Sequence, residues 1–360
     1  MDPERCWLWL ARVLGPAAEN AGDLLAVYGD AETILNARFA EDFSAFLTPP
    51  QLDRLQSLDP ADCDRELAAC HRLGVQLLYP GHPDYPAAFL AIPDLPVLLY
   101  ATGEPGLLTD RILVGMVGSR RPSPYGVEAA ARLGGEMARG GAVLVSGLAD
   151  GLDSQAHAAA LDAGELTVGV LGCAIDKTYP AANRVLRGRI ERQGAVFSEY
   201  GPGAQTFAAS FLQRNRLIAA LSDALVVVEA RHKSGTMSTV RHAERYGRPV
   251  YAVPGSIFSS LSEGTNALLA ENRARAVCRG ADVLEPLGLT APAAAKSRRA
   301  PLPAGDAGRV LALLGPTPKG FEQLKQESTL SAGALLAALT QLELAGRIDA
   351  LAGRRYQRRG

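Results

Sequence analysis

Short runs of apolar residues recur through the middle of the chain, each about five residues long. They cover residues 112–117, 142–146, 167–171, 195–198, 224–228 and 250–253. Continuous apolar runs of this length are typical of strands buried on both faces of a parallel sheet. The segments between them are long enough for crossover helices. The pattern therefore predicts an α/β fold, an extended Rossmann-like domain with a doubly wound parallel sheet.

The flanking regions have different patterns. Residues 1–70 show helical spacing interrupted by Gly and Pro, which predicts a small helical domain of the SAM or helix-hairpin-helix-like kind. We assign residues 71–287 to the Rossmann-like domain, with strand-like pieces at 75–79 and 97–100 that extend its sheet. Residues 288–306 are rich in Pro, Ala and basic residues, as in a mobile linker.

The last segment, residues 307–360, has three helix-sized pieces followed by a short hairpin. The apolar face of its last predicted helix is made by leucines, namely Leu335, Leu336, Leu339, Leu342 and Leu344. That helix ends at Gly346, and two short strand-like pieces flank Gly353. This outline predicts a winged-helix domain.

Charge is distributed unevenly, although the formal net charge of the chain is only −1. Residues 1–105 carry 6 Lys/Arg and 16 Asp/Glu, whereas residues 106–285 carry 20 and 17. Residues 286–305 and 306–360 each add a balance of +3. A polyanion would therefore bind to the middle or the end of the chain. The acidic first region is expected to serve packing or partner binding.

Composition also limits the location and the chemistry. The five cysteines are scattered and never spaced as C-x-x-C, so we expect neither a disulfide framework nor structural zinc. The N-terminus does not resemble a signal peptide, and no apolar run approaches the roughly 20 residues of a membrane span. These features favour a cytoplasmic protein.

Potential ligand-binding residues follow the predicted strands, because ligands of doubly wound sheets bind beyond the carboxyl ends of the strands. Glycines, hydroxyl side chains and arginines after the first and fifth strands are suited to an anion. The alternative for each is a tight turn with solvated side chains. The motif Arg214-Asn215-Arg216, three residues after Phe211, could grip phosphates and stack a base. Equally, its arginines could pair with Glu199 or Glu229.

Evidence for catalysis is weak at every strand end. Asp153 and His157 share a helix face, but we interpret Asp153 as a helix N-cap and His157 as a hydrogen-bonded partner. Cys173 lies in an apolar run, as a buried thiol would. The sequence has neither a G-x-G-x-x-G nor a Walker A motif, so dinucleotide or ATP binding is poorly supported. We expect binding without catalysis, no cofactor and no metal.

Taken in order, the motifs of the central region resemble those of the DNA-processing protein A (DprA/Smf) family of recombination mediators. They are VGSRRPSPYG (117–126), SGLADGLDSQAH (146–157), LGCAIDKTYPAAN (171–183), SEYGPG (198–203), FLQRNRLIAALSD (211–223), VVEARHKSGTMST (227–239), GRPVYAVPG (247–255) and GTN (264–266). The match is collinear over roughly residues 75–285.

This resemblance implies a binding protein for single-stranded DNA that forms a homodimer through its Rossmann-like domain. It would help to load the RecA recombinase onto strands covered by single-strand-binding protein, in natural transformation and DNA repair. The residues that would contact DNA are Gly118, Ser119, Arg120, Ser123, Gly147, Lys177, Asn183, Arg184, Phe211, Arg214, Asn215, Arg216, Ser234, Gly235 and Thr236.

Two other functions remain open. The first is a phosphoribohydrolase-like enzyme, whose motif P-G-G-x-G-T-x-x-E is similar at Gly235 and Thr236. Thr239 stands where the motif has its glutamate, which removes the general acid/base candidate. The second is a winged-helix transcription factor with a nucleotide-sensing domain. Basic residues near the C-terminus favour it, including Arg354 and Arg355.

Overall fold

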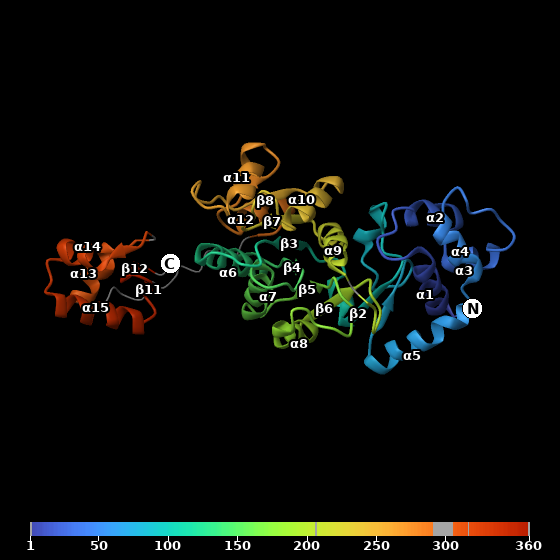
Figure 1. Ribbon diagram of the computed structural model, residues 1–360, viewed down its shortest axis with the longest axis horizontal. Coiled ribbons are helices and arrows are strands. Elements are labelled where there is room, and N and C mark those ends of the chain that lie inside the picture. Colours follow the sequence, from blue (N-terminus) through green and yellow to red (C-terminus); the bar gives the residue numbers. More distant parts are fainter. Residues whose placement is uncertain (1, 206, 291–304, 316, 359–360) are drawn as a thin grey trace. The chain divides into compact units, whose positions relative to one another are not determined.

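The chain folds into two compact units. The computed structural model describes all residues except 1, 206, 291–304, 316 and 359–360 (Figure 1). The first unit is Met1–Pro292 and the second is Ala293–Gly360. Most of the segment that was expected to be a linker, residues 291–304, lies outside the described residues.

A large mixed sheet forms the centre of the first unit (Figure 1). Its strands are β1 (Gln76–Leu78), β2 (Leu99–Gly103), β3 (Leu113–Val117), β4 (Val143–Ser146), β5 (Thr167–Val170), β6 (Gly194–Ser198), β7 (Ala224–Val227), β8 (Val250–Ala252) and β9 (Arg275–Ala276). Their order across the sheet is β1-β2-β6-β5-β4-β3-β7-β8-β9. All neighbours from β6 to β9 are parallel, whereas β1 and β2 add an antiparallel edge. The predicted doubly wound α/β fold is confirmed.

Both faces of the sheet are buried, which explains the continuous apolar runs. In β3, Val114 and Met116 belong to one hydrophobic core, whereas Leu113 and Val117 belong to the other. Successive side chains of a strand point to opposite faces, so a doubly covered strand is apolar at nearly every position.

Helices cover the two faces. Those that follow the parallel strands are α6 (Pro124–Arg139), α7 (Leu152–Asp162), α8 (Arg184–Arg192), α9 (Ala208–Leu221), α10 (Thr236–Arg245), α11 (Glu263–Ala270) and α12 (Ala281–Leu284). Residues of α6, α7 and α12 pack in one core, and residues of α9 and α10 pack in the other. Short 3₁₀ turns span Pro60–Cys63, Ala87–Ala91, Pro105–Leu108, Ala181–Asn183 and Glu285–Leu287.

The chain reverses its direction across the sheet at β3. From β3 it proceeds through β4, β5 and β6 on one side, and it returns to β7, β8 and β9 on the other. The carboxyl ends of β3 and β7 therefore mark the topological switch point, where doubly wound sheets bind their ligands.

The N-terminal helices share a core with the sheet. They are α1 (Pro3–Leu14), α2 (Ala21–Tyr28), α3 (Ala31–Ala37), α4 (Pro49–Ser57) and α5 (Asp64–Leu73). Helix α1 begins after the capping residue Asp2, and its Trp9 indole donates to the carbonyl of Leu58 at 3.0 Å. Arg245 of α10 contacts Glu19 at 3.5 Å, which joins this region to the Rossmann-like part.

The second unit is a small helical domain with a three-stranded sheet. Its elements are α13 (Asp306–Leu313), β10 (Lys319–Gly320), α14 (Phe321–Ser328), α15 (Ala332–Leu344), β11 (Ile348–Leu351) and β12 (Arg355–Arg358), with strand order β10-β12-β11. Leu335, Leu339 and Leu342 of α15 lie in its core, as the predicted apolar face requires. The helix α15, the glycine Gly346 and the hairpin of β11 and β12 follow one another as in a winged-helix domain.

Helix length bears on membrane insertion. Among the helices of the described residues, none has the length and apolar character that a bilayer crossing requires.

Candidate nucleic-acid interface

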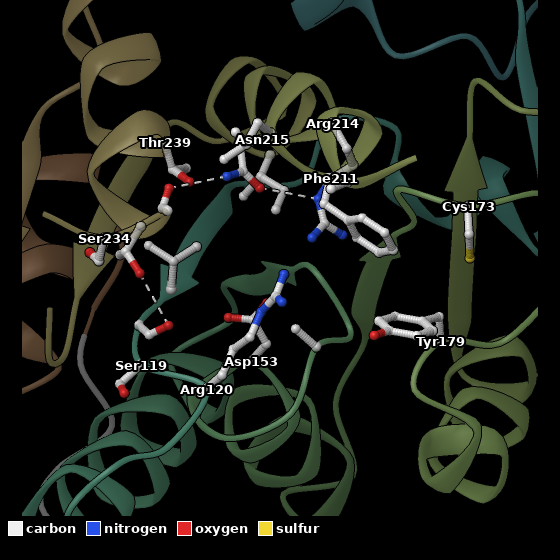
Figure 2. Close-up of a pocket in the computed structure, with 18 of the residues that line it drawn as sticks. Ser119, Arg120, Asp153, Cys173, Tyr179, Phe211, Arg214, Asn215, Ser234 and Thr239 are labelled. Atoms are coloured by element: carbon white, nitrogen blue, oxygen red, sulfur yellow. Dashed lines mark hydrogen bonds between the residues drawn. The ribbon is translucent and has the colours of Figure 1, made fainter. Parts of the chain in front are cut away.

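A pocket of about 1170 Å³ opens at the switch point of the sheet (Figure 2). Its walls are the segments that follow β3, β4, β5 and β7, together with one face of α9. Because the carboxyl ends of parallel strands meet at one edge, residues far apart in sequence converge here.

Basic side chains dominate the charge of this pocket. Its lining contains five Arg or Lys residues and two carboxylates, a formal excess of three positive charges. The exposed cations are Arg120, Lys177, Arg184 and Arg231. Within the described part of the chain, none of these four forms an ion pair. They are available to an anionic ligand.

Aromatic rings lie among these cations. Tyr179 and Phe211 lie with their ring centroids 5.2 Å apart, and the Arg120 guanidinium is 5.8 Å from the centroid of Phe211 (Figure 2). Tyr179 is 57% exposed, and Phe207 in the same lining is 68% exposed. Exposed rings beside cations can stack a flat base while its phosphates are neutralised.

Arg214 lies at the floor of the pocket and serves the fold. Its guanidinium is buried and donates to the carbonyl oxygens of Gly147, at 2.6 Å, and Val170. Burial lowers its pKa to about 10, which leaves it charged at neutral pH. The pKa of nearby Asp153 is raised by burial, and Arg214 is the first group that opposes this shift. Arg214 therefore ties the ends of β4 and β5 together beneath any ligand.

Arg216 is not brought to this pocket. Its side chain is 2% exposed, pairs with Glu199 and approaches Asp94 at 4.0 Å. The sequence left open that an arginine of the Arg214-Asn215-Arg216 motif pairs with Glu199, and Arg216 is the arginine that does so. Glu229 instead accepts hydrogen bonds from the backbone and the hydroxyl of Ser123.

Several other predicted residues hold the loops in place. Ser123 caps α6 by accepting from the amide of Gly126 at 3.1 Å, so its side chain is occupied. Asn183 donates to the carbonyl of Leu148 at 2.9 Å. Asn215 lines the pocket and donates to Ser238 at 2.8 Å. Gly147 lies beside Arg214 in an adjoining hollow of about 50 Å³.

The start of α10 completes one wall. Ser234, Gly235 and Thr236 all line the pocket, as do Gly118 and Ser119. Thr236 donates to the carbonyl of Gly118 at 3.2 Å, whereas the buried Ser234 hydroxyl has no hydrogen-bond partner among the described residues. A hydroxyl and free amides at a helix start suit a phosphate oxygen.

The candidate catalytic groups are buried and occupied. The Cys173 thiol is 4% exposed and donates to the carbonyl of Lys177 at 3.7 Å, and burial raises its pKa. His157 is fully buried beside Thr167 at 2.8 Å, and burial lowers its pKa to about 3. Gly151, and not Asp153, occupies the N-cap of α7, so that expectation is corrected.

The described residues contain neither a cluster of metal ligands nor, at position 239, the glutamate of the phosphoribohydrolase motif. Among the described residues, no group of three or more His, Cys, Asp or Glu side chains could hold a metal ion. The pocket wall has Thr239 where the phosphoribohydrolase motif has a glutamate.

The DNA contacts predicted from the sequence left out several lining residues, namely Tyr179, Phe207, Arg231 and Thr239. Tyr179 and Arg231 lie within motifs of the central region, and an aromatic residue after a strand end was the available signal for Tyr179. Phe207 precedes α9 and had no signal of its own. Its position depends on how the loop after β6 returns to the switch point.

Fold and site together define a Rossmann-like protein with a cationic, aromatic-lined pocket and a winged-helix unit. Residues 76–288 match the family described as DNA recombination-mediator protein A, and residues 291–354 match the DprA winged helix domain. The chain belongs to the DNA recombination-mediator protein A family, as its motifs indicated.

Individual relatives agree with this assignment. The DNA processing protein DprA of Bacillus subtilis is 35% identical over 223 residues, which are 62% of this chain and 75% of the relative. The crystal structure of DprA from Streptococcus pneumoniae is 34% identical, with a TM-score of 0.66 over 77% of this chain and 95% of that chain. A Helicobacter pylori DprA structure, described for its single-stranded DNA binding mode, is 35% identical, with a TM-score of 0.54 over 59% of this chain and 95% of that one.

Proposed function

We propose that this protein binds single-stranded DNA in the switch-point pocket and acts as a recombination mediator. The observation that carries the proposal is that exposed cations without an ion pair among the described residues line the same pocket as the rings of Tyr179 and Phe211. Arg120, Lys177, Arg184 and Arg231 would neutralise phosphates, and the rings would stack an unpaired base. The single-stranded DNA binding mode described for the Helicobacter pylori relative supports this choice of ligand.

A single strand suits this pocket better than a duplex. Paired bases are stacked inside a double helix and cannot reach rings that lie within a pocket, whereas a flexible strand can turn a base into it. The binding would depend strongly on salt and only weakly on base sequence.

The winged-helix unit gives less support to sequence-specific binding of duplex DNA than the pocket gives to binding of a single strand. Winged helices place their second helix in the major groove, where Lys and Arg contact phosphates and base edges. Helix α15 contains neither Lys nor Arg over its 13 residues. Arginines are instead found in the hairpin, at Arg354, Arg355 and Arg358. We propose an auxiliary DNA contact for this unit.

The cellular role that we propose follows the family. The protein would help to load RecA onto single strands covered by single-strand-binding protein, in natural transformation and in repair. It would act as a homodimer joined through the Rossmann-like domain, so that two short grooves form a longer path. The proposed site of action is the cytoplasm, where it would meet both the recombinase and the incoming strand. We propose no catalytic step.

Fluorescence anisotropy with labelled oligonucleotides tests the DNA-binding proposal. We expect tighter binding of a single strand than of a duplex of the same length, and weaker single-strand binding by Tyr179→Ala. A base that stacks on an aromatic ring contributes about 1–3 kcal/mol, which corresponds to a loss of roughly five- to 150-fold.

Arg72→Ala provides the control, because Arg72 is an exposed cation of α5 outside the pocket. It should bind as the wild type does. Equal affinity for both DNA forms, or unchanged binding by Tyr179→Ala, would refute the proposed site.

A further inference from the structure

A second hollow of about 840 Å³ adjoins the pocket on the same unit. The two hollows share the lining residues Leu212, Ser234 and Gly235. These shared residues, from α9 and the segment that leads into α10, form a divide between the two hollows.

The two hollows use different faces of α9. Phe211, Arg214 and Ile218 face the first pocket, whereas Gln213 and Arg216 face the second. Leu212 lies on the divide and is 51% exposed. This division follows the helical period, because residues three, four and seven apart share a face.

At Gly235, no side chain of a described residue blocks the divide between the two hollows. Apart from the two neighbours of Gly235 along the chain, the described residues would place a single atom within 4 Å of a Cβ atom here, a side-chain carbon of Leu212 at 3.7 Å. Because glycine has no side chain there, a flexible chain could pass from one hollow to the other.

Helix α10 supplies positive charge to the second hollow. One face of the helix carries Met237, Arg241 and Arg245 at four-residue intervals, so the two arginines lie on the same side. A further cation, Lys233, precedes the helix. Lys233 and Arg241 are exposed, and neither forms an ion pair or a side-chain hydrogen bond with a described residue.

The acids of this hollow are already paired. Asp94 is 3% exposed and accepts hydrogen bonds from Tyr246 at 2.8 and 2.9 Å, with Arg216 at 4.0 Å and Arg245 at 3.9 Å. Glu19 contacts Arg245 at 3.5 Å. Lys233 and Arg241 therefore remain as surplus positive charge, beside the unpartnered hydroxyl of Ser234 on the divide.

We propose that the second hollow holds the sugar-phosphate backbone of the strand whose base occupies the first pocket. Lys233 and Arg241 bind phosphates of nucleotides that have crossed the divide at Gly235. This subsite rests on the proposed single-stranded DNA binding. It assigns to α10 the function of extending the footprint along the strand, and the ligand is recognised by its phosphates and not by its bases.

Anisotropy with oligothymidylates of increasing length tests this subsite. A strand of about 4 nucleotides is short enough to remain in the first pocket, and one of about 16 is long enough to cross the divide. We expect the double variant Lys233→Ala/Arg241→Ala to bind the short strand like the wild type. Its affinity for the long strand should fall roughly three- to tenfold, and its salt slope should be smaller by about 1.4, or 0.7 for each phosphate that is no longer neutralised.

Two controls separate this subsite from other effects. Arg72→Ala should bind both lengths normally, and the thermal midpoint of the double variant should be unchanged because both side chains are exposed. Arg241→Lys should retain long-strand binding, since a phosphate contact requires the charge.

The outcomes distinguish this inference from the function on which it rests. Equal losses at both lengths, or no loss at either, would overturn the subsite. So would normal DNA binding combined with lost RecA loading, because that result would assign Lys233 and Arg241 to a protein partner. If Arg120→Ala also left both lengths unaffected, the single-stranded DNA site itself would be wrong.

Discussion

Arg120 and Arg214 lie in the same pocket, but replacing them should have different consequences. Arg120 is exposed and forms no ion pair with a described residue, so its replacement by alanine removes one proposed phosphate contact and the contact with the Phe211 ring. Arg214 is buried and donates to two backbone carbonyls, so its replacement removes hydrogen bonds that hold strand ends together.

The magnitudes follow from these contacts. Each phosphate neutralised on a single strand contributes about 0.7 to the slope of log K against log salt, so the four exposed cations predict a slope of about −2.8. Arg120→Ala should reduce it to about −2.1 with unchanged stability. A buried carbonyl that loses its partner costs about 1–3 kcal/mol, so Arg214→Ala should lower the free energy of unfolding by about 2–6 kcal/mol.

The assay combines anisotropy over a salt series with urea denaturation of both variants and of Arg72→Ala. A short oligothymidylate restricts the measurement to the first pocket. An unchanged salt slope for Arg120→Ala would refute the phosphate role of Arg120. Wild-type stability of Arg214→Ala, with a reduced slope, would show that Arg214 contacts DNA and not the fold.

Three further predictions concern buried groups and the second unit. Burial lowers the pKa of His157 to about 3 in the native state, whereas its pKa in the unfolded state is near 6.5. Between these pH values the unfolded state binds one more proton than the native state. The free energy of unfolding should therefore fall by up to about 1.4 kcal/mol for each pH unit below 6.5. Urea denaturation across this pH range should show the dependence reduced in His157→Gln, and an identical pH profile would contradict the assignment. Cys173 is buried and its pKa is raised, so iodoacetamide should modify the exposed Cys278 much faster, as mass spectrometry of the digested protein can show; equal rates would count against the buried thiol. Truncation after Pro292 should weaken single-strand binding only modestly in the anisotropy assay, because the pocket lies within the first unit, and complete loss would disprove a pocket-centred site.

Much of the fold could be predicted from the sequence because the parallel strands are buried on both faces. Their runs are apolar at nearly every position, and the predicted strands at 112–117 and 224–228 correspond to β3 and β7 within one residue at each end. The N-terminal helices were also visible from their spacing. Their shared core with the sheet was not, because a buried helix face does not identify what covers it.

The site was predictable only in part. Turns after strands indicated where Arg120 and Ser234 would converge, because strand ends of a parallel sheet meet. The family resemblance implied DNA contacts for both arginines around Asn215, whereas the helical period places Arg214 and Arg216 on different faces of α9. The sequence left open whether these arginines contact DNA or pair with Glu199 or Glu229, and the tertiary structure shows that Arg216 pairs with Glu199.

Photo-crosslinking tests the central claim most directly. A single strand containing 5-iododeoxyuridine would be irradiated with the full-length protein, and the crosslinked peptides identified by mass spectrometry. Binding in the switch-point pocket predicts crosslinks to the peptides that contain Tyr179 and Phe211, with fewer at high salt. Crosslinks confined to the winged-helix unit, residues 307–358, would contradict it.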